Sequence, residues 1–427
     1  MSVLDERLEQ LESAIAGRSL LWFGIRGLDA RRLELLESFT AAFSITAPHQ
    51  AAGLHRSCSL EQLTHRRVDL DAYDIDLDPQ PAVDRFRHEV LAAMAEPSVL
   101  CSYRPSVFIA TLGFATRGSC EVVDQFVERQ RPFEHKPWVE TSLEAQGVRT
   151  LGWRYLPRER RQRLSLDPGP SGLVLRPDRS SGGVGISLVT SRTEAMAAWE
   201  DNHALLMGVA PYLDRAIPLN VGGCVYADGS VTLQPASLQL IGIPNLTDRP
   251  FGYCGNDFAA VRLLSSSVLD ELDRSVRLVG TWLSNQGYRG GFGADYLLSD
   301  RELYFAEVNA RLQGSTRLAT ALVAEAGHLD PMLEHLASQL GLPPLEDLTL
   351  NQWAERIHPA AQLITHRRAA DPADAPVPRL RGARRTMVPD DGVVVEVGGV
   401  FAVDAFDHQV TDDGFHLFET TLRAGQV

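Results

Sequence analysis

The sequence predicts an α/β protein built from several units, and three features support this. The chain has 427 residues, of which 44% are hydrophobic and 22% charged, so it is long enough for about three domains of ~100–200 residues each. Apolar segments of strand length alternate with amphipathic helical segments near the N-terminus. A hairpin with opposed acidic residues is predicted near residue 300. The composition excludes a disulfide-stapled miniprotein and an intrinsically disordered chain.

The charge balance restricts the partners. Acidic residues outnumber Lys and Arg by 55 to 41, giving a net charge of −14, which disfavours capture of nucleic acid or of an anionic membrane. No run of about 18 apolar residues occurs, and the N-terminus has no apolar signal segment. The five cysteines form no C-x-x-C pair, which argues against a zinc ribbon or a disulfide framework. We therefore expect a cytoplasmic protein.

The N-terminal unit, residues 1–125, alternates strands and helices and therefore predicts a Rossmann-like parallel sheet. Gly24 and Gly27 follow the first strand, but their spacing is not the full dinucleotide fingerprint, so we interpret them as a tight turn. The predicted elements are strands at 19–25, 43–46 and 98–102 and helices at 29–43 and 83–95. Beyond residue 346 the chain becomes Pro-rich and then β-branched, which predicts a small β-rich C-terminal appendage.

The most informative segment is the predicted hairpin. Two apolar runs flank a polar three-residue loop: 294–298, 303–308 and the loop 300–302. If the loop is centred on Arg301, Asp295 lies directly opposite Glu307, because both are six residues from the centre. Directly opposed side chains have Cβ atoms about 4.5–5.5 Å apart.

Strand alternation places Asn309 and Arg311 on the same face as Glu307. Two carboxylates and an amide oxygen among apolar neighbours are strongly disfavoured unless a cation neutralises them. Hard oxygen ligands of this kind suit Mg²⁺, with Asp295, Glu307 and Asn309 as its ligands. Arg311 would supply a fixed positive charge to a phosphoryl or carboxylate group, and is our candidate catalytic residue. A solvated acid pair at a sheet edge is the alternative.

This acid followed by Glu-x-Asn-x-Arg resembles the metal-binding hairpin of the ATP-grasp superfamily. The resemblance implies two lobes that clamp ATP, with two Mg²⁺ ions, or Mn²⁺ in their place, bridging its phosphates. The segment 173–188 is strand, Gly-rich loop and strand, and resembles the flexible loop that covers the phosphates in this family. Its candidate phosphate-binding residues are Ser181, Gly182, Gly183 and Gly185. By itself such a loop also fits a plain hairpin.

The resemblance assigns further residues. Arg176 stands where the family has a phosphate-binding Lys, and its guanidinium could take over that role. Lys136 opens a segment that resembles the one carrying the family's second phosphate-binding Lys. The alternative for Lys136 is a solvent-facing side chain at a helix start. The inter-lobe hinge, which meets adenine, corresponds to Pro211, Tyr212, Leu213 and Asp214. The family's ribose-binding Glu is missing before this hinge, so Asp214 or Asn220 would take its place. Substrate-binding candidates at a helix start are Gln313, Gly314 and Ser315, against a simple N-cap at Ser315.

The resemblance implies an ATP-dependent carboxylate–amine ligase. ATP would phosphorylate a carboxylate, and an amine would attack the acyl phosphate to give an amide, ADP and phosphate. The overall arrangement is similar to natural-product peptide ligases of the pheganomycin ligase type, with amino acids or peptides as substrates. A biotin- or purine-type carboxylase and a catalytically degenerate nucleotide-binding regulator are the alternatives, and a homodimer is left open. The expected units are 1–125, 126–207 (small lobe), 208–345 (large lobe) and 346–427.

Overall fold

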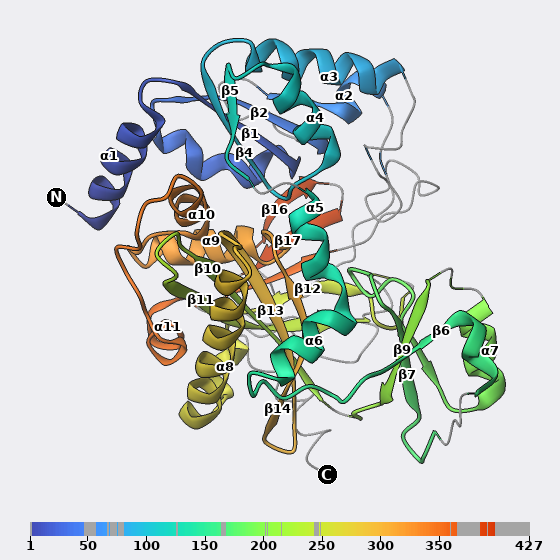
Figure 1. The fold of residues 1–427 in the computed structure, drawn as a ribbon. Coiled ribbons are helices and arrows are strands. Elements are labelled where there is room, and N and C mark those ends of the chain that lie inside the picture. Colours follow the sequence, from blue (N-terminus) through green and yellow to red (C-terminus); the bar gives the residue numbers. More distant parts are fainter. Residues whose placement is uncertain are drawn as a thin grey trace.

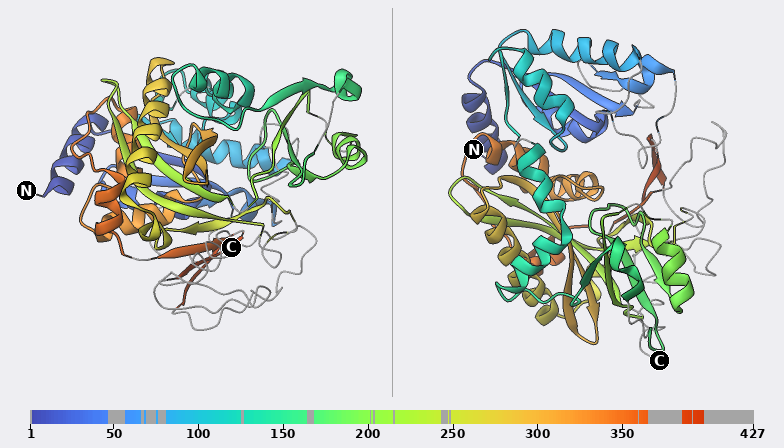
Figure 2. Two further views of the ribbon diagram at one scale, coloured as in Figure 1. Left: turned by 90° about the horizontal axis from the view of Figure 1, so that it is seen from below. Right: turned by 45° about the vertical axis from the view of Figure 1, so that its right-hand side comes forward.

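Three sheets organise the part of the chain that the structure describes (Figure 1). The computed structural model describes residues 2–46, 57–65, 68, 75, 81–124, 127–163, 168–200, 202, 204–214, 216–242, 247, 249–358, 360–364, 385–390 and 392–397. A five-stranded parallel sheet forms the N-terminal unit at the top of Figure 1; below it, an eight-stranded antiparallel sheet and a four-stranded antiparallel sheet lie side by side, as the right view of Figure 2 also shows. No helix among these residues combines the length and the apolar character that crossing a bilayer needs.

The N-terminal sheet has the order β3-β2-β1-β4-β5, with all neighbours parallel. Alternation along β1 sends Leu20 and Trp22 to one apolar core and Leu21 and Phe23 to the other, because successive side chains point to opposite faces. The elements are α1 Val3–Ile15, β1 Ser19–Arg26, η1 Gly27–Leu35, β2 Phe39–Thr46, β3 Ser57–Ser59, α2 Leu60–Thr64, α3 Pro81–Met94, β4 Ser98–Ser102, α4 Val107–Ala115 and β5 Cys120–Val122.

One predicted helix in this unit is wrong. Instead of a helix over 29–43, the short 3-10 helix η1 ends at Leu35 and β2 begins at Phe39. Parallel pairing with β1 and burial on both faces favour the strand, since a strand covered on both sides shows a continuous apolar run rather than alternation. The other predicted strands and helices of the unit are confirmed, with ends that shift by a few residues.

The four-stranded sheet has the order β6-β9-β7-β8 and packs on α7 through Leu175, Ala195 and Trp199. Helix α6 leads toward it from the N-terminal unit (Figure 1). The elements are α5 Val127–Gln130, η2 Arg131–Glu134, α6 Lys136–Glu144, β6 Arg154–Pro157, η3 Arg158–Arg163, β7 Leu173–Pro177, β8 Ser187–Val189, α7 Arg192–Glu200 and β9 Leu206–Pro211. Lys136, which opens the segment compared above with the family, is therefore the first residue of a helix.

The eight-stranded sheet has the order β14-β13-β10-β11-β12-β15-β17-β16. Its largest core packs α8 against β10, β13 and β14 and includes Val276, Trp282 and Phe305. The elements are β10 Ile217–Val225, β11 Val231–Ile241, β12 Tyr253–Asp257, η4 Ala260–Leu263, α8 Ser266–Asn285, β13 Gly290–Ser299, β14 Glu302–Asn309, α9 Thr316–Glu325, α10 Pro331–Gln339 and α11 Leu350–Arg356.

The C-terminal segment contributes three described strands, and all of them extend the eight-stranded sheet. They are β15 Ala361–Ile364, β16 Arg385–Asp390 and β17 Gly392–Val397. The β-branched run at 392–397 is therefore a strand, as predicted. The Pro-rich stretch at 371–378 and the residues after 397 lie outside the described part of the chain.

Candidate active site

The predicted hairpin is present, but two residues close it instead of three. β13 ends at Ser299 and β14 begins at Glu302, which pairs with Ser299. The two loop residues, Asp300 and Arg301, have φ values of 50° and 67°. Positive φ at both central residues is what a type I′ turn requires. The predicted three-residue loop is therefore wrong, since Glu302 belongs to the strand.

The predicted opposition of Asp295 and Glu307 is confirmed, through a feature that the sequence did not predict. With a two-residue loop, regular pairing would place Asp295 opposite Ala306. The register shifts by one between Asp295 and Tyr296, so that Ala306 is an extra residue, a β-bulge, and Glu307 becomes the partner of Asp295. The bulge thus positions the acid pair.

Amide groups surround Asp295. Its carboxylate accepts hydrogen bonds from Asn220 (2.7 Å), Gln239 (3.0 Å) and Asn309 (3.4 Å). Burial, and after it the charge of Glu307, raises the pKa of Asp295 to about 7. When two carboxylates lie this close, ionising the second one is unfavourable because the negative charges repel each other, and a bound cation would reduce that repulsion. This electrostatic arrangement is what a metal site of oxygen ligands requires.

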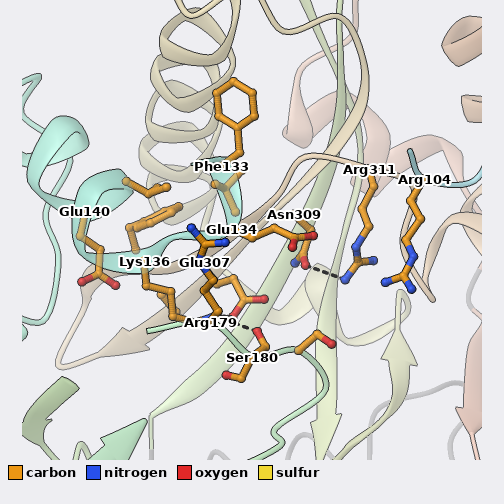
Figure 3. Close-up of a pocket in the computed structure, with 15 residues that line it drawn as sticks. Arg104, Phe133, Glu134, Lys136, Glu140, Arg179, Ser180, Glu307, Asn309 and Arg311 are labelled. Carbon is orange, nitrogen blue, oxygen red and sulfur yellow. Dashed lines mark hydrogen bonds and ion pairs between the residues drawn. The ribbon is translucent and has the colours of Figure 1, made fainter. Parts of the chain in front are cut away.

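Next to the hairpin lies a cleft of about 240 Å³ (Figure 3). The cleft brings together five of the predicted site residues; they are Lys136, Ser181, Glu307, Asn309 and Arg311. Asp295 is not in its lining but contacts Asn309 behind it. Arg311 donates to Asn309 Oδ1 (3.0 Å) and to the carbonyl of Leu312 (3.1 Å), so it is held beside the acid pair.

Lys136 begins α6, and its side chain is buried at the edge of the cleft, with the residue 5% exposed. Its ammonium group lies 3.0 Å from Glu307 Oε2 and donates to the carbonyl of Ser180 (2.8 Å). The alternative of a solvent-facing Lys is therefore wrong. Lys136 instead connects the Gly-rich loop to the acidic hairpin.

Arg176, expected to bind a phosphate group of ATP, contacts side chains and backbone of the protein. Its guanidinium pairs with Glu140, donates to the Tyr155 hydroxyl (2.8 Å) and lies 3.7 Å from the ring centroid of Trp153. It also donates to the carbonyl of Ala306 (2.8 Å), the bulge residue of the hairpin. Arg176 is 4% exposed and does not line the cleft. These contacts connect Arg176 to the hairpin, and its predicted role as a phosphate cation stays a prediction.

The Gly-rich loop depends on its glycines. Gly182, Gly183 and Gly185 have φ values of 58°, 78° and 73°, in the left-handed region that glycine adopts without strain. A Cβ atom on Gly183 would lie 1.9 Å from the carbonyl oxygen of Phe251, so the loop backbone touches the segment before β12. Arg249 donates to the carbonyl of Gly182 across the same contact (3.4 Å).

The predicted hinge lies where β9 leaves the small sheet. Pro211 pairs with Leu173 of β7 at the end of β9, and Tyr212 donates its N–H to the carbonyl of Gly172 (3.1 Å). The Tyr212 ring packs edge-on against Phe251, with centroids 6.5 Å apart. Leu213 and Asp214 follow before β10.

Asn220 lies in β10, directly opposite Asp295. Its amide donates to Asp295 Oδ1 and to Gln313 Oε1 (2.9 Å), and its own oxygen accepts from Ser315 Oγ (3.0 Å). These contacts place Asn220, Gln313 and Ser315 in one network behind the acid pair. Ser315 makes no side-chain capping bond to α9, so the alternative of a simple N-cap is wrong. Gly314 lies beside them, and its carbonyl accepts from Gln362 (2.8 Å).

Sequence reasoning missed two arginines of the cleft, Arg104 and Arg179. Both are exposed, and neither makes a side-chain hydrogen bond or ion pair with any residue that the structure describes. Arg179 stands at the start of the Gly-rich loop, and a positive charge in a loop expected to bind phosphate could have identified it from the sequence. Arg104 follows β4 in the N-terminal unit, and no local pattern marks it.

A second cluster of ligand-type side chains does not form a metal site. Cys101, Asp124 and His335 approach one another within 4.8 Å between the N-terminal unit and α10. However, His335 Nδ1 accepts the N–H of Gly291 (2.9 Å), so the neutral ring carries its proton on Nε2. That nitrogen faces Asp124 Oδ1 at 3.7 Å and has no lone pair for a metal. The cluster is therefore part of the packing between the two units.

Comparison with known proteins shows the fold. No protein-family model and no curated protein sequence matches the chain. Among solved structures, biotin carboxylase from Campylobacter jejuni in complex with β,γ-ATP is 14% identical with a TM-score of 0.56, covering 94% of this chain and 85% of that one. The biotin carboxylase domain of 2-oxoglutarate carboxylase from Hydrogenobacter thermophilus is 12% identical with a TM-score of 0.61, at 90% and 86% coverage.

A third similar structure is carboxyaminoimidazole ribonucleotide synthase from Aspergillus clavatus in complex with ATP. It is 14% identical with a TM-score of 0.58, covering 96% of this chain and 98% of that one. These likenesses confirm the predicted fold class, an ATP-grasp fold preceded by a parallel α/β unit. The finer resemblance to peptide ligases stays a prediction.

Proposed function

We propose that this protein is an ATP-dependent ligase that activates a carboxylate as an acyl phosphate and transfers the acyl group to an amine, releasing ADP and phosphate. The observation that carries the proposal is the opposed pair Asp295 and Glu307, with Asn309 beside it, next to a cleft bordered by Lys136 and a Gly-rich loop. This arrangement supplies what phosphoryl transfer requires of a protein, which is positioned cations and metal ligands.

The acid pair fits Mg²⁺ as the proposed metal. The donor atoms are carboxylate and amide oxygens, and burial, with the charge of Glu307 after it, raises the pKa of Asp295, which supports a need for a counter-charge at this site. Asp295, Glu307 and Asn309 would hold one or two Mg²⁺ ions, or Mn²⁺. When bound, the metal would neutralise phosphate oxygens. Asn220 and Gln239 orient the Asp295 carboxylate by donating to it.

For ATP, we propose Lys136 and Arg179 as phosphate cations, together with the N–H groups of Ser181, Gly182 and Gly185. Adenine would meet the backbone of the hinge at Tyr212 and Leu213. Asp214 is then the remaining candidate for the ribose hydroxyls, because Asn220 is engaged with the acid pair. Arg176 acts in this scheme as a positioning residue, not as a phosphate ligand.

The substrate carboxylate would bind near Arg311, which Asn309 and the Leu312 carbonyl hold in place. There the fixed guanidinium would orient the carboxylate toward the terminal phosphate and stabilise negative charge during phosphoryl transfer.

We further propose that the acid and the amine are amino acids or peptides, as in natural-product peptide ligases. The proposed location is the cytoplasm, and the proposed units are 1–125, 126–207, 208–345 and 346–427.

A carboxylase is the second candidate, favoured by the named activities of the similar structures. In that case bicarbonate would be the carboxylate, and the same acid pair and cations would serve. The two functions differ in the co-substrate that triggers ADP release. A catalytically degenerate regulator is less favoured, because every residue type of the acid hairpin is present and converges.

The test is incubation of the full chain with Mg-ATP and pooled amino acids, acids and amines, followed by mass spectrometry for ADP and a dehydrated product. Hydroxylamine added in place of amine should trap the acyl phosphate as a hydroxamate. ADP release that depends on bicarbonate alone would favour the carboxylase, AMP would contradict acyl phosphate chemistry, and ATP binding without turnover would favour the regulator.

Glu307→Gln should abolish ADP formation in this assay while leaving the fold intact. Glu302→Gln is the matched control, since Glu302 lies on the same strand but is exposed and faces Arg149 outside the cleft. Unchanged turnover in Glu307→Gln would overturn the metal assignment.

A further inference from the structure

The N-terminal unit directs one cationic side chain into the cleft. In the strand order β3-β2-β1-β4-β5 the chain runs outward in one direction from β1 and in the other from β4, so the topological switch point lies between these strands. Ligands of open parallel sheets bind outside the carboxyl ends of the strands at such a point. Arg104 follows the carboxyl end of β4 by two residues and lines the cleft.

Arg104 shares the cleft with Arg311, which comes from the eight-stranded unit. Figure 3 shows both guanidinium groups at the end of the cleft away from Lys136. The Nε of Arg311 is buried and has no hydrogen-bond partner among the described residues. Both charges act on Tyr103: burial raises its pKa, the charges of Arg311, Arg26 and Arg104 lower it, and the charge of Asp29 raises it further.

The acidic side chains of the cleft lining are engaged elsewhere. Glu307 pairs with Lys136, Glu140 pairs with Arg176 and the Glu134 carboxylate accepts from Gln130 (3.1 Å). Two positive groups therefore share this end of the cleft, and neither forms an ion pair with an acidic residue that the structure describes. Like charges in one cleft repel unless an anion lies between them. The geometry thus calls for an anionic ligand at this end.

We propose that Arg104 and Arg311 together bind the carboxylate of the acid substrate, so that the N-terminal unit contributes to the acid site. The inference rests on the proposed ligase function and adds a substrate-binding residue to it. A nucleotide phosphate is the less favoured occupant, because Lys136, Arg179 and the Gly-rich loop lie at the other end of the cleft. Guanidinium groups from two units can bind a carboxylate through paired N–H donors, which fixes its orientation.

The test compares Arg104→Ala and Arg104→Lys with Arg85→Ala. Arg85 is an exposed arginine of α3 in the same unit and does not line the cleft, so it controls for the loss of one surface charge. The full chain is saturated with MgADP, and binding of malonate and of a pool of N-acetyl amino acids is measured by calorimetry. N-acetyl groups block the amine, so these probes report on the acid site alone. MgADP affinity is measured separately for each variant.

We expect Arg104→Ala to weaken carboxylate binding by about 10- to 100-fold, with partial rescue in Arg104→Lys and no change in Arg85→Ala. The affinity for MgADP should stay the same in all three. Three results would overturn the inference. Arg104→Ala could bind the carboxylates as tightly as the wild type, or it could lose MgADP affinity in parallel with carboxylate affinity. The third is a wild type that binds none of the carboxylates.

The same samples separate this inference from the ligase proposal. An acid that binds through Arg104 but gives neither ADP nor hydroxamate with Mg-ATP leaves the subsite in place and contradicts the ligase. ADP release that needs an acid but is unchanged in Arg104→Ala supports the ligase and contradicts the subsite.

Discussion

Replacing Arg176 by Lys distinguishes a phosphate ligand from a residue that positions the hairpin. The guanidinium of Arg176 pairs with Glu140, donates to Tyr155 and the Ala306 carbonyl, and stacks on Trp153. A Lys side chain keeps a charge but carries it on one nitrogen, which cannot reach these groups in the same geometry or stack as a plane. We therefore expect Arg176→Lys to fail as a conservative change.

The magnitude follows from the hydrogen bonds and the ion pair that a Lys side chain cannot reproduce. A hydrogen bond to a charged group contributes about 1.5–3 kcal/mol, and weakening a buried ion pair leaves Glu140 poorly compensated, so we expect a loss of about 3–5 kcal/mol. Burial lowers the pKa of Arg176 to about 9. An amine, whose unperturbed pKa is about 10.4, would in this site lose part of its charge at neutral pH and add to the loss.

The assay is urea denaturation followed by tryptophan fluorescence, to which Trp153 contributes directly because it stacks on Arg176. Arg154→Lys, at an exposed position of β6, is the matched control. Arg176→Lys should shift the transition to lower urea, and Arg176→Met combined with Glu140→Gln should recover part of the stability. A variant with unchanged unfolding and a selective loss of ATP affinity would refute this reasoning and restore Arg176 as a phosphate ligand.

Three further predictions concern the loop, a buried acid and the N-terminal helix. Gly183→Ala should raise the KM for ATP about tenfold or more, because the new Cβ atom would collide with the backbone of Phe251. Gly182→Ala places its Cβ atom in open space and adds only backbone strain of about 1 kcal/mol, so its effect on KM should be smaller. Equal effects of the two variants would contradict a role for the contact between Gly183 and Phe251. Burial raises the pKa of Asp257 to about 7, so the native state holds the proton more tightly than the unfolded chain and the free energy of unfolding falls as pH rises from about 4 to 7. Asp257→Asn lacks this loss, so its free energy of unfolding in urea titrations should gain up to about 4 kcal/mol relative to the wild type across this range. A difference between the two proteins that does not change with pH would refute the shift. Arg7→Met should cost about 3–5 kcal/mol in urea denaturation, because it leaves Glu334 buried without its partner, and Arg7→Met with Glu334→Gln should recover most of that loss.

The acid hairpin shows what local sequence predicts and where it stops. The hairpin that carries Asp295 and Glu307 was predictable because clear apolar runs flank a polar turn, but the direct opposition of the two acids depends on a bulge. The type of turn was not predictable, since neither Asp300 nor Arg301 is the glycine that usually marks positive φ. The bulge residue Ala306 accepts a hydrogen bond from Arg176, which lies 130 residues away in the chain, and no local pattern reports such a contact.

The N-terminal unit and the cleft show the same limit. The apolar periodicity predicted most strands, but residues 39–43 were assigned to a helix because parallel pairing with β1, which decides their conformation, is a tertiary property. Arg104 and Arg179 were missed for a similar reason. An exposed arginine has no local pattern of its own, and only the convergence of three units on one cleft distinguishes these two from the others.

Lys136 explains how the proposed nucleotide and metal sites depend on each other. Its ammonium group lies 3.0 Å from Glu307, which is also a proposed metal ligand, and it donates to Ser180 of the Gly-rich loop. Lys136 and a metal ion are therefore alternative counter-charges for one carboxylate. A phosphate group that binds Lys136 would draw the ammonium away from Glu307 and leave that carboxylate to the metal. Mg²⁺ and ATP should thus bind cooperatively, because each makes available the partner that the other needs.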